Sequence, residues 1–108
     1  MDYIEVAKVE DIPVGHMKLL TAKGTEILVV NYDGNYYAIG GRCTHMKGNL
    51  SQGKLEGKIV TCPRHGSRFD VTTGVSISGP KIGFLKLKTG NEPKYEVKVE
   101  GNGIKINI

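Results

Sequence analysis

The chain has 108 residues, which suits a single domain with a modest core. Its formal net charge of +4, mixed charges and lack of a long apolar run indicate a soluble globular protein without a membrane span. The first residues lack the basic and apolar segments of a signal peptide, so we expect a cytoplasmic protein. Nucleic-acid binding is disfavoured, because neither a recognition helix nor an aromatic RNA-binding motif is visible.

Short alternating apolar and polar runs, separated by glycine-rich turns, predict an all-β chain. In chain order the expected strands span residues 3–9, 17–21, 25–32, 36–39, 58–61, 69–71, 75–77, 84–88, 95–100 and 104–108. Turn residues at 33–35 and 72–74 predict hairpins, and further turns are expected at 91–93 and 101–103. A short helical turn is expected only at 9–12. The predicted fold class is an all-β sandwich or partly open barrel.

Two short segments hold both cysteines of the chain and two of its three histidines. The sequence is Cys-Thr-His at 43–45 and Cys-Pro-Arg-His at 62–65, with sixteen residues between the two segments. Thiolates and imidazoles together indicate a metal site, with Cys43, His45, Cys62 and His65 as candidate ligands.

Three interpretations of this ligand set are open. One is a 2Fe-2S cluster with two cysteines on one iron and two histidines on the other. A second is zinc, although zinc fingers keep their cysteine pair apart from their histidine pair, whereas here each segment contains one of each. A disulfide between the cysteines is the third, and it leaves both neighbouring histidines unexplained.

The two segments resemble the ligand motifs of Rieske proteins. The resemblance extends to Gly66, Phe69-Asp70, Thr73-Gly74 and Ser78-Gly79-Pro80. It implies one 2Fe-2S cluster, with Cys43 and Cys62 on one iron and His45 and His65 on the other. It also implies the Rieske fold as a single domain over residues 1–108. An antiparallel β base would come from residues 1–41 and 83–108, and residues 42–82 would form an inserted cluster-binding lobe.

The family's function follows from the same resemblance. It implies a monomeric ferredoxin that is not itself an enzyme and passes single electrons from a reductase to an oxygenase or another acceptor. The alternative is a Rieske-like small subunit of a larger oxidoreductase, such as nitrite reductase. Rieske proteins of cytochrome bc complexes have an extra cysteine in each ligand loop, where this chain has Gly48 and Arg64. Ser67 matches a serine that donates to a bridging sulfide in that high-potential branch. The missing disulfide, and Phe69 at the position of its tyrosine donor, nevertheless favour the soluble, low-potential branch.

Charge is unevenly distributed along the chain. Residues 41–82 contain seven Lys or Arg and two acids, whereas residues 1–40 contain three Lys and six acids. The predicted lobe is therefore basic. It is either a solvated surface or a docking surface for an acidic redox partner, since complementary charge accelerates encounter.

Overall fold

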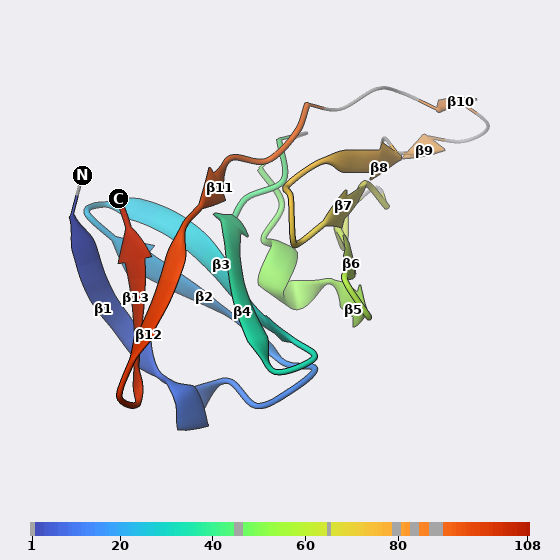
Figure 1. Ribbon diagram of the computed structural model, residues 1–108. Coiled ribbons are helices and arrows are strands. Elements are labelled where there is room, and N and C mark those ends of the chain that lie inside the picture. Colours follow the sequence, from blue (N-terminus) through green and yellow to red (C-terminus); the bar gives the residue numbers. More distant parts are fainter. Residues whose placement is uncertain (1, 45–46, 65, 79–80, 83–84, 87–89) are drawn as a thin grey trace.

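The computed structural model describes residues 2–44, 47–64, 66–78, 81–82, 85–86 and 90–108. Its described part is built from short antiparallel strands, which confirms the all-β prediction (Figure 1). The strands are β1 (Tyr3–Lys8), β2 (Met17–Ala22), β3 (Thr25–Tyr32), β4 (Asn35–Gly40), β5 (Lys54–Glu56), β6 (Ile59–Thr61), β7 (Arg68–Asp70), β8 (Ser76–Ser78), β9 (Lys81–Ile82), β10 (Leu85–Lys86), β11 (Lys94–Tyr95), β12 (Val97–Glu100) and β13 (Gly103–Asn107). Two 3-10 turns, η1 (Val9–Asp11) and η2 (Leu50–Gln52), complete it.

Both ends of the chain contribute to two sheets that pack together. One sheet has the order β1-β13-β12, and the other has the order β2-β3-β4-β11. The turn between β3 and β4 places Asp33 and Gly34 at φ 54 and 88°, the conformation of a tight hairpin turn that matches strand twist. Asn31 Oδ1 accepts from Gly34 N at 3.0 Å and fixes this turn. The predicted hairpin is therefore confirmed.

β3 is buried on both faces, and this places it at the centre of the molecule. Ile27 and Val29 pack into a cluster with Ile104 and Ile106 of β13. Leu28 and Val30 point to the opposite face, because side chains alternate along a strand, and they pack into a second cluster.

The second cluster joins β3 to the sheet formed by residues 54–78. That sheet has the order β5-β6-β7-β8, and it supplies Val60 and Phe69 to the shared core. Cys43 and Cys62 belong to the same buried cluster. The two cysteines are therefore held by the packing of the central sheet against the smaller one, which lies beside it in Figure 1.

Some expected elements differ from those observed. The run at 95–100 is not one strand: β11 pairs with β4, and β12 pairs with β13 after a break at Glu96. The chain changes sheets at this break, which accounts for the interruption. β5 and η2 were not predicted. Of the strand expected at 84–88, residues 85–86 form β10, whereas 84, 87 and 88 lie outside the described residues.

No helix in the described ranges has the length and apolar character needed to cross a membrane.

Candidate metal centre

The segment around Cys62 is the loop of a short hairpin. β6 and β7 pair up to Thr61 and Arg68, and residues 62–67 connect them. Inside the loop, Cys62 N donates to Ser67 O at 2.7 Å and Gly66 N donates to Cys62 O at 3.2 Å. Gly66 has φ +79°, a left-handed conformation that glycine adopts at little cost.

The segment around Cys43 repeats this arrangement. Arg42 bridges to Asn49, so residues 43–48 form a loop of the same length. Cys43 N donates to Gly48 O at 2.7 Å, and Lys47 N donates to Cys43 O at 3.0 Å. Lys47 has φ +56° at the position equivalent to Gly66. Each cysteine is thus held in the same backbone frame, with its N–H and C=O both engaged.

The two loops are closely packed against each other. Cys43 and Cys62 are only 1% and 2% exposed, and they are thiols, not a disulfide. A Cβ atom placed on Gly48 would lie 2.8 Å from Cys62 Sγ, closer than such atoms approach. The first loop therefore passes directly over the second cysteine, and a glycine is needed for that approach.

Ser67 supplies a further sign that a group belongs between the loops. Its Oγ is buried, and it has no hydrogen-bond partner among the described residues. A buried hydroxyl without a partner is unfavourable in a finished interior. Two buried thiols beside an unsatisfied donor fit a cluster that has sulfur acceptors.

Other predicted site residues fall outside the described residues. They are His45, His65, Gly79 and Pro80. The structure therefore places the two candidate cysteines in one buried cluster, and metal ligation by all four candidate residues remains a prediction.

Glu92 is a feature of the site that the sequence analysis missed. The run at 91–93 was expected to be only a turn, but Glu92 is 5% exposed. Its Oε2 accepts from Thr44 N at 2.8 Å, between the two candidate ligand positions of the first loop. Burial raises the pKa of Glu92 to about 7, and the hydrogen bond from Thr44 opposes this only in part. No local pattern marks this contact, because its two partners are 48 positions apart in the chain.

Asp70 is also buried, but its hydrogen bonds stabilise the turn that follows it. Its Oδ1 accepts from Thr72 N at 2.8 Å and from Thr72 Oγ1 at 2.6 Å, and its Oδ2 lies 3.5 Å from Lys58 Nζ. Burial acts to raise the pKa of Asp70, but the Thr72 hydrogen bonds and the Lys58 charge outweigh it, so the pKa is lowered.

Comparison with known proteins identifies the family. The family model of the Rieske [2Fe-2S] domain matches residues 2–89. The chain belongs to this family. The ferredoxin component of a naphthalene 1,2-dioxygenase system from Pseudomonas aeruginosa is 34% identical over 98% of this chain and 95% of its own length. The ferredoxin component of the naphthalene 1,2-dioxygenase/salicylate 5-hydroxylase systems from Ralstonia sp is 33% identical over 99% and 96%, respectively.

Solved structures agree with the assignment to the Rieske family. The ferredoxin of carbazole 1,9a-dioxygenase from Nocardioides aromaticivorans IC177 aligns with a TM-score of 0.83 at 27% identity, over 98% of this chain and 97% of that chain. A complex of reduced oxygenase and oxidised ferredoxin in carbazole 1,9a-dioxygenase aligns with a TM-score of 0.84 at 28% identity, over 96% and 91%.

The resemblance to Rieske proteins predicts that Gly48 and Arg64 match the two disulfide cysteines of the cytochrome bc branch. The structure places them side by side: a Cβ on Gly48 would lie 3.3 Å from Arg64 Cγ. The two positions are thus neighbours in this chain too, without a cysteine at either. Phe69 is fully buried, and its ring packs in the shared core.

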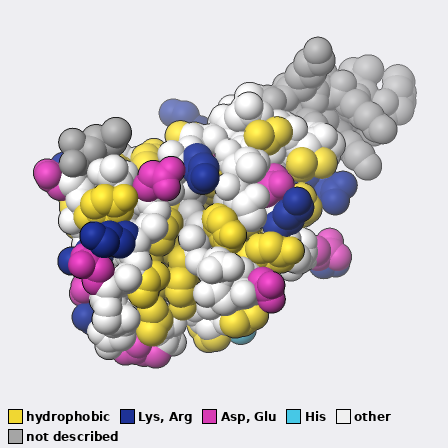
Figure 2. Space-filling view, viewed as in Figure 1, with side chains coloured by type: hydrophobic (Ala, Val, Ile, Leu, Met, Phe, Trp, Pro, Cys, Tyr) yellow, Lys and Arg dark blue, Asp and Glu magenta, His cyan; other side chains and the backbone are white. Residues whose placement is uncertain are grey.

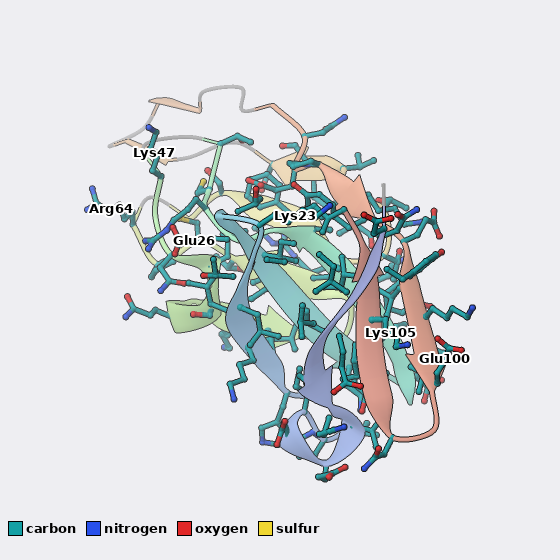
Figure 3. All side chains as sticks on the ribbon, turned by 90° about the vertical axis from the view of Figure 1, so that its left-hand side faces the viewer. Lys23, Glu26, Lys47, Arg64, Glu100 and Lys105 are labelled. Atoms are coloured by element: carbon teal, nitrogen blue, oxygen red, sulfur yellow. The ribbon has the colours of Figure 1, made fainter. Side chains whose placement is uncertain are left out.

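Basic side chains lie at the end of the molecule that contains the two loops. Lys47 and Arg64 are exposed and lie near each other there, far from Lys105 and Glu100 (Figure 3). Within the described ranges, neither forms an ion pair. Arg42 differs from them, because Glu26 binds it at 2.8 and 3.0 Å.

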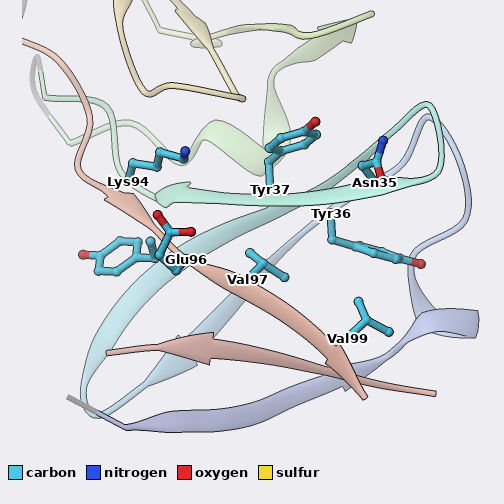
Figure 4. Close-up of a pocket in the computed structure, with 8 residues that line it drawn as sticks. Asn35, Tyr36, Tyr37, Lys94, Glu96, Val97 and Val99 are labelled. Atoms are coloured by element: carbon cyan, nitrogen blue, oxygen red, sulfur yellow. The ribbon is translucent and has the colours of Figure 1, made fainter. Parts of the chain in front are cut away.

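Two surface grooves differ in their relation to the centre. One, of about 400 Å³, reaches the first loop and is lined in part by Cys43, Thr44, Lys47 and Glu92. The other, of about 330 Å³, lies between β4 and β12 (Figure 4). Hydrophobic side chains are visible over this region of the surface in Figure 2. Its lining has neither thiol nor imidazole, so it is not part of the metal centre.

Proposed function

We propose that the protein is a one-electron carrier with one 2Fe-2S cluster, held by Cys43 and Cys62 on one iron and by His45 and His65 on the other. The observation that supports this most is the pair of matching loops, which place both cysteines in one buried cluster and bring Gly48 of the first loop against Cys62 Sγ of the second. Such a cluster takes up and releases a single electron when bound. The chain's own residues supply the ligands, exclude water from the thiolate side and offer the Ser67 hydroxyl to the cluster.

The partners we propose are a reductase as donor and an oxygenase or other redox protein as acceptor. Support comes from the relatives, which are named as ferredoxin components of dioxygenase systems, and from a neighbour solved in complex with an oxygenase. The docking surface would be the loop end, where Lys47 and Arg64 are exposed. The carrier itself would have no substrate chemistry, since the proposed ligands leave no open iron position.

Metal and sulfide analysis tests the cofactor directly. Protein purified from its native source should contain about two irons and two acid-labile sulfides per chain. It should also give a Rieske-type electron paramagnetic resonance spectrum after reduction. Cys62→Ser should abolish normal assembly, because a hydroxyl replaces one thiolate ligand. Stoichiometric zinc without labile sulfide would contradict the proposal.

The reduction potential and the cellular setting complete the proposal. We expect a potential in the lower half of the Rieske range of roughly −150 to +300 mV, because the disulfide and the tyrosine donor of the cytochrome bc branch are both replaced. We further propose a cytoplasmic monomer. Cell fractionation and gel filtration are the corresponding measurements.

A further inference from the structure

Glu92 is a buried acid that no ligand motif contains. It comes from the segment just before β11, yet its Oε2 accepts from Thr44 N at 2.8 Å. The accepted N–H belongs to the peptide that joins Cys43 to Thr44. Thr44 also donates through Oγ1 to Gly90 O at 2.6 Å. The backbone N–H and the side-chain hydroxyl of Thr44 therefore both bond the first loop to residues 90–92.

Glu92 is itself held in place by its surroundings. Its N–H donates to Gly74 O at 2.7 Å, and Pro93 O accepts from Gly40 N at 2.9 Å. A Cβ at Gly40 would overlap Glu92 Oε1, and a Cβ at Gly74 would overlap Glu92 O. Two glycines thus leave room for this side chain and its backbone, which contact β4, the β7–β8 turn and the first loop.

We propose that Glu92 is a positioning residue of the centre, which fixes the Cys43–Thr44 peptide and so the orientation in which the first loop presents Cys43. This inference rests on the proposed cluster ligation. Partners behind the ligands commonly fix ligand geometry in metal sites. Here the partner acts on a ligand's backbone, and it anchors the loop to β4, to the β7–β8 turn and to the start of β11.

Two substitutions distinguish the effect of side-chain length at position 92 from the effect of its charge. Glu92→Gln keeps an acceptor oxygen at the same distance from the backbone but removes the charge. Glu92→Asp keeps the charge but withdraws the oxygens by one carbon–carbon bond. If Glu92 acts through its hydrogen bond to Thr44, the Gln variant should keep the wild-type resonance spectrum, whatever its stability, and the Asp variant should not. A role through charge alone predicts the reverse.

The experiment compares the holoproteins by two measurements. The first is the electron paramagnetic resonance spectrum of the reduced protein, which reports ligand geometry. The second is the rate of visible-absorbance loss on transfer to a chelator. For Glu92→Asp we expect shifted resonances and release about tenfold faster, which corresponds to about 1.4 kcal/mol, within the range of about 0.5 to 1.5 kcal/mol for a single intramolecular hydrogen bond.

Two control variants distinguish positioning from general destabilisation. Glu96→Asp makes the same change at an exposed position of the same segment. Asn31→Ala removes a buried side chain that bonds Ile12 O and Gly34 N, away from both loops. Both should keep the wild-type spectrum, even if Asn31→Ala lowers the unfolding temperature.

The possible outcomes divide clearly. An altered Asp variant with a wild-type-like Gln variant supports positioning by Glu92. An unaltered Asp variant, or equal alteration of the Asp and Gln variants, overturns it, as does a changed spectrum in Asn31→Ala. A wild-type protein without iron and sulfide would instead overturn the proposed function, and this inference with it.

Discussion

Glu92 makes the stability of the protein depend on pH in a direction that is unusual for an acid. Its pKa is about 7 in the folded chain, against 4.5 for an ordinary glutamate. Below pH 4.5 the side chain is protonated in both the folded and the unfolded chain, so it adds no penalty. As pH rises from 4.5 to 7, the unfolded chain loses this proton first. The free energy of unfolding therefore falls across that window and levels off above it.

The magnitude follows from the difference between the two pKa values. Each tenfold change in proton affinity corresponds to about 1.4 kcal/mol. Between pH 5 and 8 the carboxyl of Glu92 should thus reduce the free energy of unfolding by about 2 to 3 kcal/mol. Asp70 has the opposite sign, because its lowered pKa gives stability that is lost as pH falls.

Glu92→Gln isolates the contribution of Glu92, since the amide resembles the protonated acid and cannot ionise. We expect the difference in unfolding free energy between this variant and the wild type to grow by about 2 to 3 kcal/mol from pH 5 to 8. The measurement is anaerobic urea denaturation of the oxidised holoproteins at several pH values. Other titrating groups, Asp70 included, cancel in the difference. Parallel curves across the whole range would refute the reasoning.

Three further predictions concern the loops and their support. Ser67→Ala should lower the reduction potential by about 20 to 60 mV, because a neutral hydrogen bond of about 0.5 to 1.5 kcal/mol is lost; an unchanged value in voltammetry would show that the hydroxyl does not reach the cluster. Lys47→Glu and Arg64→Glu should slow electron transfer to an acidic partner, and rising salt should slow electron transfer by the wild type. Unchanged stopped-flow rates in both variants would show that the basic surface does not bind the partner. Gly74→Ala should lower the free energy of unfolding by about 2 kcal/mol or more, because the residue has φ +79° and its Cβ would overlap Glu92 O; thermal denaturation checks this, and a stability loss below about 0.5 kcal/mol would contradict it.

Local chemistry explains which parts of the structure were predictable from the sequence. The hairpin at Asp33-Gly34 was predicted because both residues tolerate positive φ, and the two residues alone specify the turn. The ligand motifs were equally visible, since a thiolate and an imidazole at short spacing need no distant partner to be noticed. Both features are contained in a few adjacent residues.

Contacts between distant segments explain what the sequence did not reveal. The run at 95–100 alternates like one strand, but the pairing changes at Glu96. The chain pairs with β4 before this residue and with β13 after it. The burial of Glu92 likewise depends on Gly40, Thr44 and Gly74, none of which is near it in the chain. A charged residue before a proline predicts an exposed turn unless the position of those segments is known.

The inner and outer positions of the two loops are under different physical constraints. Gly48 and Ser67 occupy equivalent places, and both are buried: a side chain at 48 would contact Cys62 Sγ, and the hydroxyl at 67 has no partner among the described residues. Lys47 and Arg64 are exposed, so their charge can change without repacking the core. In the proposed carrier, potential is therefore tuned from inside the loops and partner choice from outside. Ser67→Ala should shift the potential without slowing encounter, whereas the two charge reversals should slow encounter far more than they shift the potential.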